Sequence, residues 1–152
     1  WDTPTKRANF IFPESLNENP DVTFAGAGVL RLMTMRSDDQ FNTTVYGYDD
    51  RFRGVKGTRR VLLMNVEDIA RLGFNPGERV DVRTVCDDDV ERCVTDFTLQ
   101  AFNIPVGCAA GYFPECNPLV PLFHHARESK VPGYKSVPVR LSAAQRSAGV
   151  EA

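Results

Sequence analysis

The sequence predicts a mainly β domain, folded as a barrel or a sandwich, with one or two short helices. Apolar and polar residues alternate over about six short segments, which is the periodicity of strands. Only one segment carries both the apolar spacing and the end signals of a helix. Eleven Gly and ten Pro residues interrupt a chain of 152 residues, so that the regular segments are short. Many short strands with few helices are typical of all-β domains.

The predicted strands share an extended, apolar pattern. The clearest, residues 29–36, is apolar on both faces, as in a strand packed inside a barrel or a sandwich. In residues 80–83, Val80 and Val82 alternate with charged residues, which indicates a half-buried strand. The other expected strands are residues 60–64, 90–101 and 137–141, with a short extended piece at residues 10–12.

One helix is predicted for residues 65–72. Asn65 can cap its first turn, with Asp68 three residues later as the reciprocal capping partner. Gly73 can end the helix, because glycine readily adopts the left-handed conformation that follows many helices. The pair Pro76-Gly77 then predicts a tight turn that leads into the next strand.

Three polar segments are expected to connect these elements. Residues 37–58 are long for a connection and contain several aromatic residues, so we expect an ordered, functional loop. Residues 87–89, three aspartates, are expected at the solvated tip of a hairpin and not at a metal site. Residues 105–118 are interpreted as a Gly- and Pro-rich connector, followed by a short apolar segment at residues 119–123.

The composition is that of a globular domain with no evident membrane or nucleic-acid partner. Apolar residues make up 42% and charged residues 25%, and no apolar run approaches the length of a membrane span. The net charge of −2 gives no electrostatic reason to expect nucleic-acid binding. Basic residues cluster within residues 51–60, either as a solvated loop or as a docking surface for another domain or for phosphates. No leader segment is visible, so a cytoplasmic location is expected.

The cysteines and histidines are too dispersed to predict a closed metal site. The cysteines are Cys86, Cys93, Cys108 and Cys116, without a Cys-x-x-Cys pair, and the two histidines are adjacent. Cys86 and Cys93 flank the expected hairpin tip, so a disulfide is conceivable, although reduced thiols are favoured in a cytoplasmic protein. The sequence lacks the cysteine cluster of an iron–sulfur centre and a Ser/His/Asp arrangement. We therefore predict no metal ligand and no catalytic residue in this chain.

Four segments in order along residues 29–141 form a combined pattern. Residues 65–82 have the capped helix, Pro-Gly turn and alternating strand described above, and residues 32–44 run from a strand into Thr-x-Arg and on to Asn-Thr. Residues 111–120 place an aromatic pair before Asn-x-Leu, and residues 132–136 precede the last strand. Together they resemble the C-terminal molybdopterin-dinucleotide-binding domain of formate-dehydrogenase-like molybdopterin oxidoreductases. The resemblance makes residues 32–44, 111–120 and 132–136 the first, second and third cofactor loops.

The resemblance implies a six-stranded double-psi β-barrel, of the aspartate-decarboxylase-like kind, at residues 29–141. It implies a lead-in from a preceding domain at residues 1–28 and a tail at residues 142–152. The implied cofactor is molybdopterin guanine dinucleotide with molybdenum, or alternatively tungsten, which the isolated domain would not need in order to fold. The remaining domains of the same polypeptide are the implied partners. Because the chemistry would occur outside this domain, the isolated chain is expected to be inactive.

Ten residues are predicted to hold the guanine dinucleotide. Phosphates require cationic side chains, hydroxyls or free backbone N–H groups, and a base requires amide edges and an aromatic face. The predicted residues are Thr34, Arg36, Ser37, Gln40, Asn42, Thr43, Tyr112, Phe113, Asn117 and Lys135. Arg36 is the main phosphate candidate, although an ordinary surface ion pair fits its spacing, and Lys135 by itself would be a solvated lysine. Tyr112 and Phe113 could instead be core aromatics, and Asn117 could close a turn. Glu115 would repel a phosphate and is not included.

Two other interpretations of the sequence remain open. A stand-alone double-psi barrel could bind a protein or a nucleic acid, which only the basic residues within residues 51–60 support. A self-contained small enzyme on a related barrel would need a catalytic arrangement that the sequence lacks. If the domain instead covers a cofactor, its loop face should be unusually apolar when isolated. The aromatic residues expected there are Phe41, Tyr46, Tyr48, Phe52 and Phe113.

Overall fold

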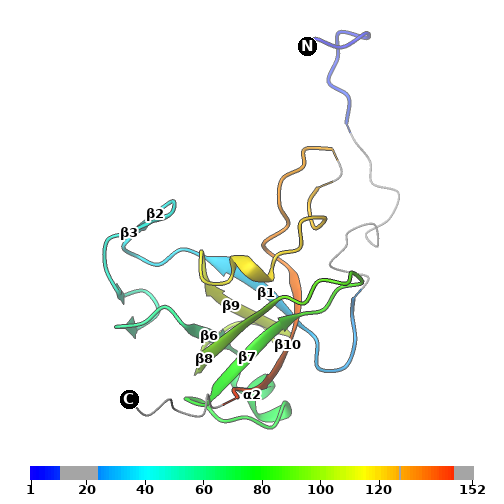
Figure 1. Ribbon diagram of the computed structural model, residues 1–152. Coiled ribbons are helices and arrows are strands. Elements are labelled where there is room, and N and C mark those ends of the chain that lie inside the picture. The colour runs from blue at the N-terminus through cyan, green and yellow to red at the C-terminus, as the bar shows by residue number, and fades with distance from the viewer. Residues whose placement is uncertain (11–23, 127, 146–152) are drawn as a thin grey trace.

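A closed barrel of six strands, in the order β1-β10-β7-β8-β6-β9, forms the centre of the computed structural model (Figure 1). The structure describes residues 1–10, 24–126 and 128–145. The barrel strands are β1 Leu30–Met35, β6 Val61–Met64, β7 Arg79–Thr84, β8 Cys93–Ala101, β9 Cys108–Tyr112 and β10 Val137–Ala143. The predicted six-stranded barrel is therefore confirmed, with a short α-helix, α2 (Val66–Arg71), at one end.

The barrel contains both parallel and antiparallel strand pairs, and strand β9 makes one pair of each kind. β9 is parallel to β1 and antiparallel to β6, while β6 is parallel to β8. The other three pairings are antiparallel. The prediction that residues 105–118 form a connector is wrong, because five of these residues build this central strand. β9 consists largely of small residues that are buried on both faces, so it shows no alternation that would have identified it.

Alternate residues of the barrel strands point into one apolar core. The core cluster from the strands comprises Leu30, Leu32, Leu62, Met64, Val80, Val82, Phe97, Leu99, Ala109, Val137 and Val139. Ile69 of α2 joins this cluster, as does Leu119 of the short 3-10 helix η2 (Asn117–Leu119). Of the apolar segment expected at residues 119–123, only Leu119 lies in η2 and is fully buried, whereas Leu122 is 93% exposed.

Residues 37–58, hereafter the ribbon segment, fold as two short antiparallel ribbons. β2 (Gln40–Phe41) pairs with β3 (Thr44–Val45), and β4 (Asp49–Asp50) pairs with β5 (Val55–Lys56). Val55 packs into a second buried cluster, on the other face of β6 and β9 from the barrel core. The remaining members of that cluster are Met35, Val61, Leu63, Ala110 and Tyr112. The long loop is ordered, as predicted, because this apolar anchor attaches it to the barrel.

Helix α2 begins and ends as the sequence predicts, with one exception. The side-chain oxygen of Asn65 accepts the backbone N–H of Glu67 at 2.9 Å. At the other end Gly73 is left-handed (φ +81°), and the N–H of Phe74 donates to the carbonyl of Ile69. The predicted capping role of Asp68 is wrong, because its buried carboxylate accepts hydrogen bonds from Arg71 and from the backbone of Gly107.

The remaining segments give one correction. β7 is not simply half-buried, because Asp81 is buried at a bulge between Val80 and Val82. There its carboxylate accepts the backbone N–H of Asp96 at 3.0 Å, which satisfies a donor that the bulge leaves out of the strand ladder. Residues 87–89 form bends between β7 and β8, and the four cysteines are free thiols. Residues 11–12 and 146–152, within the extended piece and tail expected from the sequence, lie outside the described residues. No helix in the described ranges is long and apolar enough to cross a membrane.

Candidate functional site

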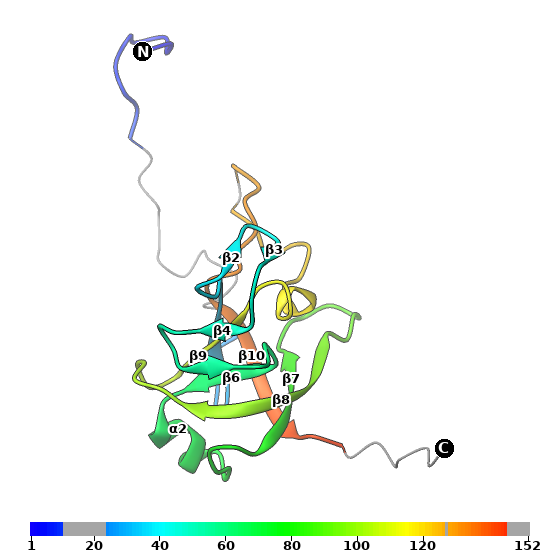
Figure 2. The same cartoon turned by 90° about the vertical axis from the view of Figure 1, so that its left-hand side faces the viewer.

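The three predicted cofactor loops meet at the end of the barrel opposite α2 (Figures 1 and 2). A cavity of about 470 Å³ lies between them, hereafter the loop cavity. It is lined by Thr34, Met35, Arg36, Phe113, Tyr134 and Lys135. Residues from three loops that are far apart in the sequence therefore surround one space, which is the arrangement that a ligand held by all three would need.

Main-chain hydrogen bonds fix the walls of the loop cavity around the end of β1. The N–H of Thr34 donates to the carbonyl of Tyr134 at 3.0 Å, and the N–H of Phe113 donates to the carbonyl of Met35 at 2.8 Å. The ammonium of Lys135 donates to the carbonyl of Thr34 at 2.6 Å. The first loop is thus bonded on one side to the second loop and on the other side to the third.

The loop cavity is electropositive. Arg36 is exposed, and no acidic side chain in the described part of the chain pairs with it. The ammonium of Lys135 donates one of its three N–H groups to the carbonyl of Thr34, and its nitrogen lies 5.2 Å from the ring centroid of Tyr134. None of the described lining residues is acidic. Two cations that retain free donors beside two aromatic rings favour a ligand that combines an anionic group with a flat apolar surface.

Behind this cavity a buried arginine that the sequence analysis did not single out joins two of the loops. Arg59 is only 4% exposed, and its Nε donates to Glu115 at 2.6 Å. Its other nitrogens donate to the hydroxyl of Ser37, to the amide oxygen of Gln40 and to the carbonyl of Phe113, at 2.6–2.8 Å. The guanidinium also lies 4.8 Å from the ring centroid of Tyr112. All its partners lie in the first and second loops.

The structure divides the ten predicted residues into two groups. Thr34, Arg36, Phe113 and Lys135 line the loop cavity, together with Met35 and Tyr134, which the sequence analysis missed. The others do not line it, and they are Ser37, Gln40, Asn42, Thr43, Tyr112 and Asn117.

The six residues outside the lining have two kinds of position. The side chains of Ser37 and Gln40 are hydrogen-bonded within the Arg59 network, and Tyr112 is a buried core aromatic that stacks on it. Exposed Asn117 starts η2, where its carbonyl accepts the N–H of Val120. The last two, Asn42 and Thr43, are exposed at the tip of the ribbon formed by β2 and β3. Direct cofactor contact by these six residues stays a prediction.

The basic residues of positions 51–60 do not form a free basic surface. Four of the five make ion pairs, which are Arg51–Asp38, Arg53–Asp50, Lys56–Asp49 and Arg59–Glu115. The fifth, Arg60, donates to the carbonyl of Thr95 at 2.8 Å. The interpretation of a stand-alone nucleic-acid or protein-binding module depended on this cluster, and pairing with carboxylates removes most of its electrostatic basis.

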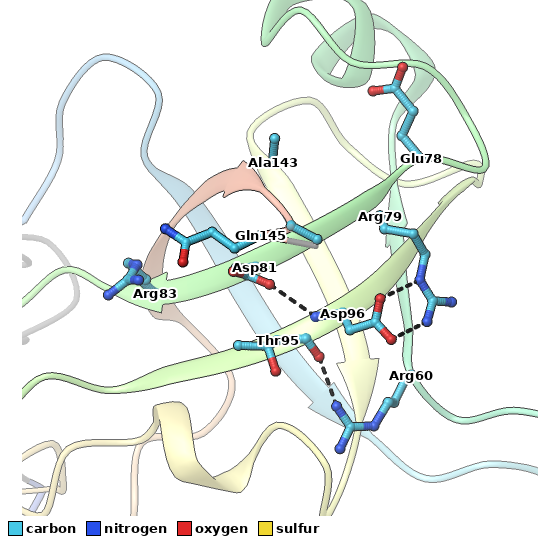
Figure 3. Close-up of a pocket in the computed structure, with 10 residues that line it drawn as sticks. Arg60, Glu78, Arg79, Asp81, Arg83, Thr95, Asp96, Ala143 and Gln145 are labelled. Atoms are coloured by element: carbon cyan, nitrogen blue, oxygen red, sulfur yellow. Dashed lines mark hydrogen bonds and ion pairs between the residues drawn. The ribbon is translucent and has the colours of Figure 1, made fainter. Parts of the chain in front are cut away.

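A larger cavity, of about 860 Å³, lies over β7, β8 and the end of β10 (Figure 3). Figure 3 shows Arg79 facing Asp96 in a two-pronged ion pair, with Asp81 directed at the backbone of Asp96. Arginines and carboxylates are mixed along its wall, and none of the ten predicted residues lines it. Its charges are compensated within the protein, so the smaller loop cavity is the better candidate for an anionic ligand. Among the described residues, no group of three His, Cys, Asp or Glu side chains could hold a metal ion.

Asp50 connects the Arg59 network to the ribbon segment and should make the stability of this region sensitive to acid. Burial opposes its ionisation, but hydrogen bonds from the Tyr112 hydroxyl (2.8 Å) and from Arg53 outweigh this and hold its pKa below 3.8. A carboxyl whose pKa is lowered on folding contributes stability above its unfolded pKa and loses that contribution as the pH falls through its folded pKa.

We therefore expect Asp50→Asn to be less stable than the wild type at pH 7, and the difference to narrow as the pH falls below 3.8. Thermal unfolding at several pH values checks this, with exposed Asp49→Asn as the control from the same strand. If the difference in stability between the wild type and Asp50→Asn does not change with pH, Asp50 does not contribute to the acid response.

Comparison with known proteins decides which family this arrangement represents. Residues 30–138 match the sequence model of the family described as molydopterin dinucleotide binding domain. The chain belongs to this family. The matched range begins in β1, ends in β10 and contains all three loops around the loop cavity, so the family assignment and the candidate site concern the same part of the molecule.

The relatives are much longer than this chain, and one of them is named as an oxidoreductase. An uncharacterized oxidoreductase of Mycobacterium tuberculosis is 51% identical over 118 residues, which are 75% of this chain and 15% of that protein. Protein YdeP of Escherichia coli is 38% identical over 143 residues, which are 93% of this chain and 19% of that protein. The acetylene hydratase structure from Pelobacter acetylenicus matches 76% of this chain with a TM-score of 0.53 and 16% identity, and shows the same fold. The chain spans less than a fifth of the length of each.

Proposed function

We propose that this domain holds the guanine dinucleotide end of a molybdopterin cofactor in the loop cavity, as part of a molybdenum- or tungsten-dependent oxidoreductase related to formate dehydrogenases. The observation that carries the proposal is the convergence of all three family loops on one electropositive cavity. The family description supports a molybdopterin dinucleotide as the ligand, and the 51% identical relative is named as an oxidoreductase.

The residues of the loop cavity fit such a group. Arg36 and Lys135 can each make charge-assisted hydrogen bonds to phosphate oxygens, which are among the stronger contacts that a protein can offer. Phe113 and Tyr134 provide aromatic surface of the kind that a flat purine base packs against. The main-chain bonds between the loops hold these groups in place, so little ordering is required on binding.

Under this proposal the domain binds and orients the cofactor and does not itself supply a reacting group. When bound, the metal–pterin part of the cofactor supplies the two-electron redox chemistry. The loop residues hold the nucleotide at a fixed position and exclude water around its phosphates, where a lower local dielectric strengthens each ionic contact. We expect the isolated chain to show no turnover of formate.

The exposed aromatic residues of the ribbon segment are evidence that other domains of the same polypeptide are its partners. Phe41, Tyr46, Tyr48 and Phe52 are 70%, 76%, 61% and 76% exposed, as the sequence analysis expected, whereas Phe113 is half-buried in the cavity wall. Several exposed aromatics on one segment are unusual for a monomer surface and are typical of a face that another protein surface covers. The greater length of the relatives is consistent with further domains beside this one.

The direct test is to replace Arg36 or Lys135 by alanine in the polypeptide that contains this chain at its natural length. A charge-assisted contact contributes about 1.5–3 kcal/mol, so each substitution should weaken cofactor binding by roughly ten- to a hundredfold. The measurement is the pterin, guanine nucleotide and metal content per folded protein after dialysis. Formate oxidation by the same samples then tests whether the parent oxidoreductase acts on formate.

Arg51→Ala is the matched control, because Arg51 is a 75% exposed arginine whose ion pair with Asp38 lies outside the lining of the loop cavity. It should leave the cofactor content unchanged. Full cofactor content in both Arg36→Ala and Lys135→Ala would remove the loop cavity as the binding site. A wild-type polypeptide purified without any pterin dinucleotide, under conditions in which related holoenzymes retain theirs, would contradict the proposed function itself.

A further inference from the structure

We propose that Arg59 is the positioning residue of the loop cavity, which fixes its first and second loops relative to each other without touching the ligand. The proposal rests on the proposed function only in assigning a purpose to the cavity, because the contacts of Arg59 are a property of the protein alone. The residue stands outside the lining of the cavity, yet it bonds to the segments on both sides of it.

The contacts of Arg59 join the first and second loops beyond the last main-chain bond between β1 and the second loop, from the N–H of Phe113 to the carbonyl of Met35. On the first-loop side they reach the Ser37 hydroxyl at 2.6 Å and the Gln40 amide oxygen at 2.8 Å. On the second-loop side they reach the Phe113 carbonyl at 2.6 Å and both carboxylate oxygens of Glu115. Gln40 adds a bond of its own to the Phe113 carbonyl at 2.7 Å. These bonds hold residues 37–40, which directly follow Arg36, and residues 113–115, which include Phe113. Both Arg36 and Phe113 line the loop cavity.

This arrangement needs the planar fork of an arginine. The guanidinium presents donors in fixed directions, so that one side chain can satisfy a carboxylate, a hydroxyl, an amide and a carbonyl together. A lysine would keep the positive charge beside Glu115, but its single ammonium is a point charge with three donors and cannot reach all these partners. The sequence-based exclusion of Glu115 from the cavity is consistent with this, because Glu115 neutralises Arg59 and leaves Arg36 and Lys135 to the ligand.

The Arg59 network extends to the exposed ribbon segment. Tyr112 packs its ring on the Arg59 guanidinium and donates its hydroxyl to Asp50, and Asp50 in turn pairs with Arg53. Among the described residues, none of this network belongs to the barrel core, although Tyr112 belongs to the second buried cluster beside that core. Loss of the Arg59 fork should therefore loosen two loops while the barrel stays folded.

Arg59→Lys in the natural-length polypeptide tests the proposal, with Arg79→Lys as the matched control. Arg79 also makes a two-pronged contact to a carboxylate, Asp96, but in the cavity over β7 and β8. Three quantities are measured for each protein: the thermal midpoint, backbone amide exchange of the cofactor-free form, and pterin dinucleotide content per folded protein. We expect Arg59→Lys to accelerate exchange in residues 37–43 and 113–117 together and to reduce retained cofactor at least tenfold. Arg79→Lys should change neither.

Three outcomes would overturn the positioning role. The first is unchanged exchange in both loops, and the second is faster exchange in the loops with full cofactor retention. The third is a lowered midpoint with faster exchange throughout the barrel and normal cofactor content in the folded fraction, which would make Arg59 merely structural. If Arg59→Lys does not fold, Glu115→Gln, which weakens the same clamp, should accelerate exchange in the same two loops. If Arg59→Lys loosens both loops but the wild-type polypeptide binds no pterin dinucleotide, the clamp is supported and the proposed function is refuted, so the two failures are distinguishable.

Discussion

Replacing Asp68 by alanine is expected to lower the free energy of unfolding by about 3 kcal/mol, because a buried donor and a charged partner both lose their acceptor. The Asp68 carboxylate is fully buried at the start of α2 and accepts the N–H of Gly107 at 2.5 Å and the guanidinium of Arg71 at 2.6 Å. Gly107 precedes β9, and its carbonyl in turn accepts the N–H of Arg31 in β1. The carboxylate therefore fixes the point at which the helix, β9 and β1 come together.

Glu67→Ala provides the control for Asp68→Ala. Glu67 is an exposed carboxylate in the same helical turn, so it has a similar interaction with the helix dipole but no tertiary bond through its side chain. Its removal should change the free energy of unfolding by less than about 1 kcal/mol. Chemical denaturation of the two variants measures the difference. Equal effects of the two substitutions would show that the bond to Gly107 contributes no net stability.

The sequence predicted those parts of the fold whose signals are local. The capping Asn65, the left-handed Gly73 and the Pro76-Gly77 turn all depend on the nearest few residues, and all appear as expected. Strand β9 was missed because its burial depends on strands far away in the sequence. β1 and β6 pair with its two edges, and the barrel core and the second buried cluster cover its two faces, so both faces are buried and no alternation arises. The role of Asp68 was mistaken for the same reason, since Gly107 is 39 positions away in the sequence.

The candidate site shows a similar division. Family resemblance identified three loops, and the structure brings residues of all three to the loop cavity. It could not show that Ser37 and Gln40 would be engaged by a buried arginine, because nothing in the spacing of residues 51–60 separates Arg59 from its exposed basic neighbours. Exposed and buried arginines look alike in a sequence. The one available signal was the acidic residue Glu115 in the second loop, which required a cationic partner if it was to lie beside a phosphate site.

Gly111→Ala is expected to destabilise the barrel and to displace the second loop. Gly111 lies in β9 between Thr34 of β1 and Leu62 of β6, and a β-carbon there would overlap the sulfur of Cys116. Cys116 is fully buried, and burial raises the pKa of its thiol to about 12, so the side chain behaves as a small neutral group packed against the strand. Overpacking of this kind costs about 1–3 kcal/mol. The N–H of Cys116 donates to the carbonyl of Tyr112, so a displaced Cys116 should move Phe113 as well.

A double-mutant cycle with Cys116→Ala separates this overlap from other effects of the substitution. Cys116→Ala alone removes one buried sulfur and should cost about 1–2 kcal/mol, as other large-to-small core substitutions of this size do. In the Cys116→Ala background the new methyl group at position 111 has room, so adding Gly111→Ala should cost less than about 1 kcal/mol, and the two substitutions should couple by roughly 1 kcal/mol or more. Denaturant unfolding of the four proteins gives the coupling. Strictly additive costs would mean that Cys116 is not what requires glycine at this position.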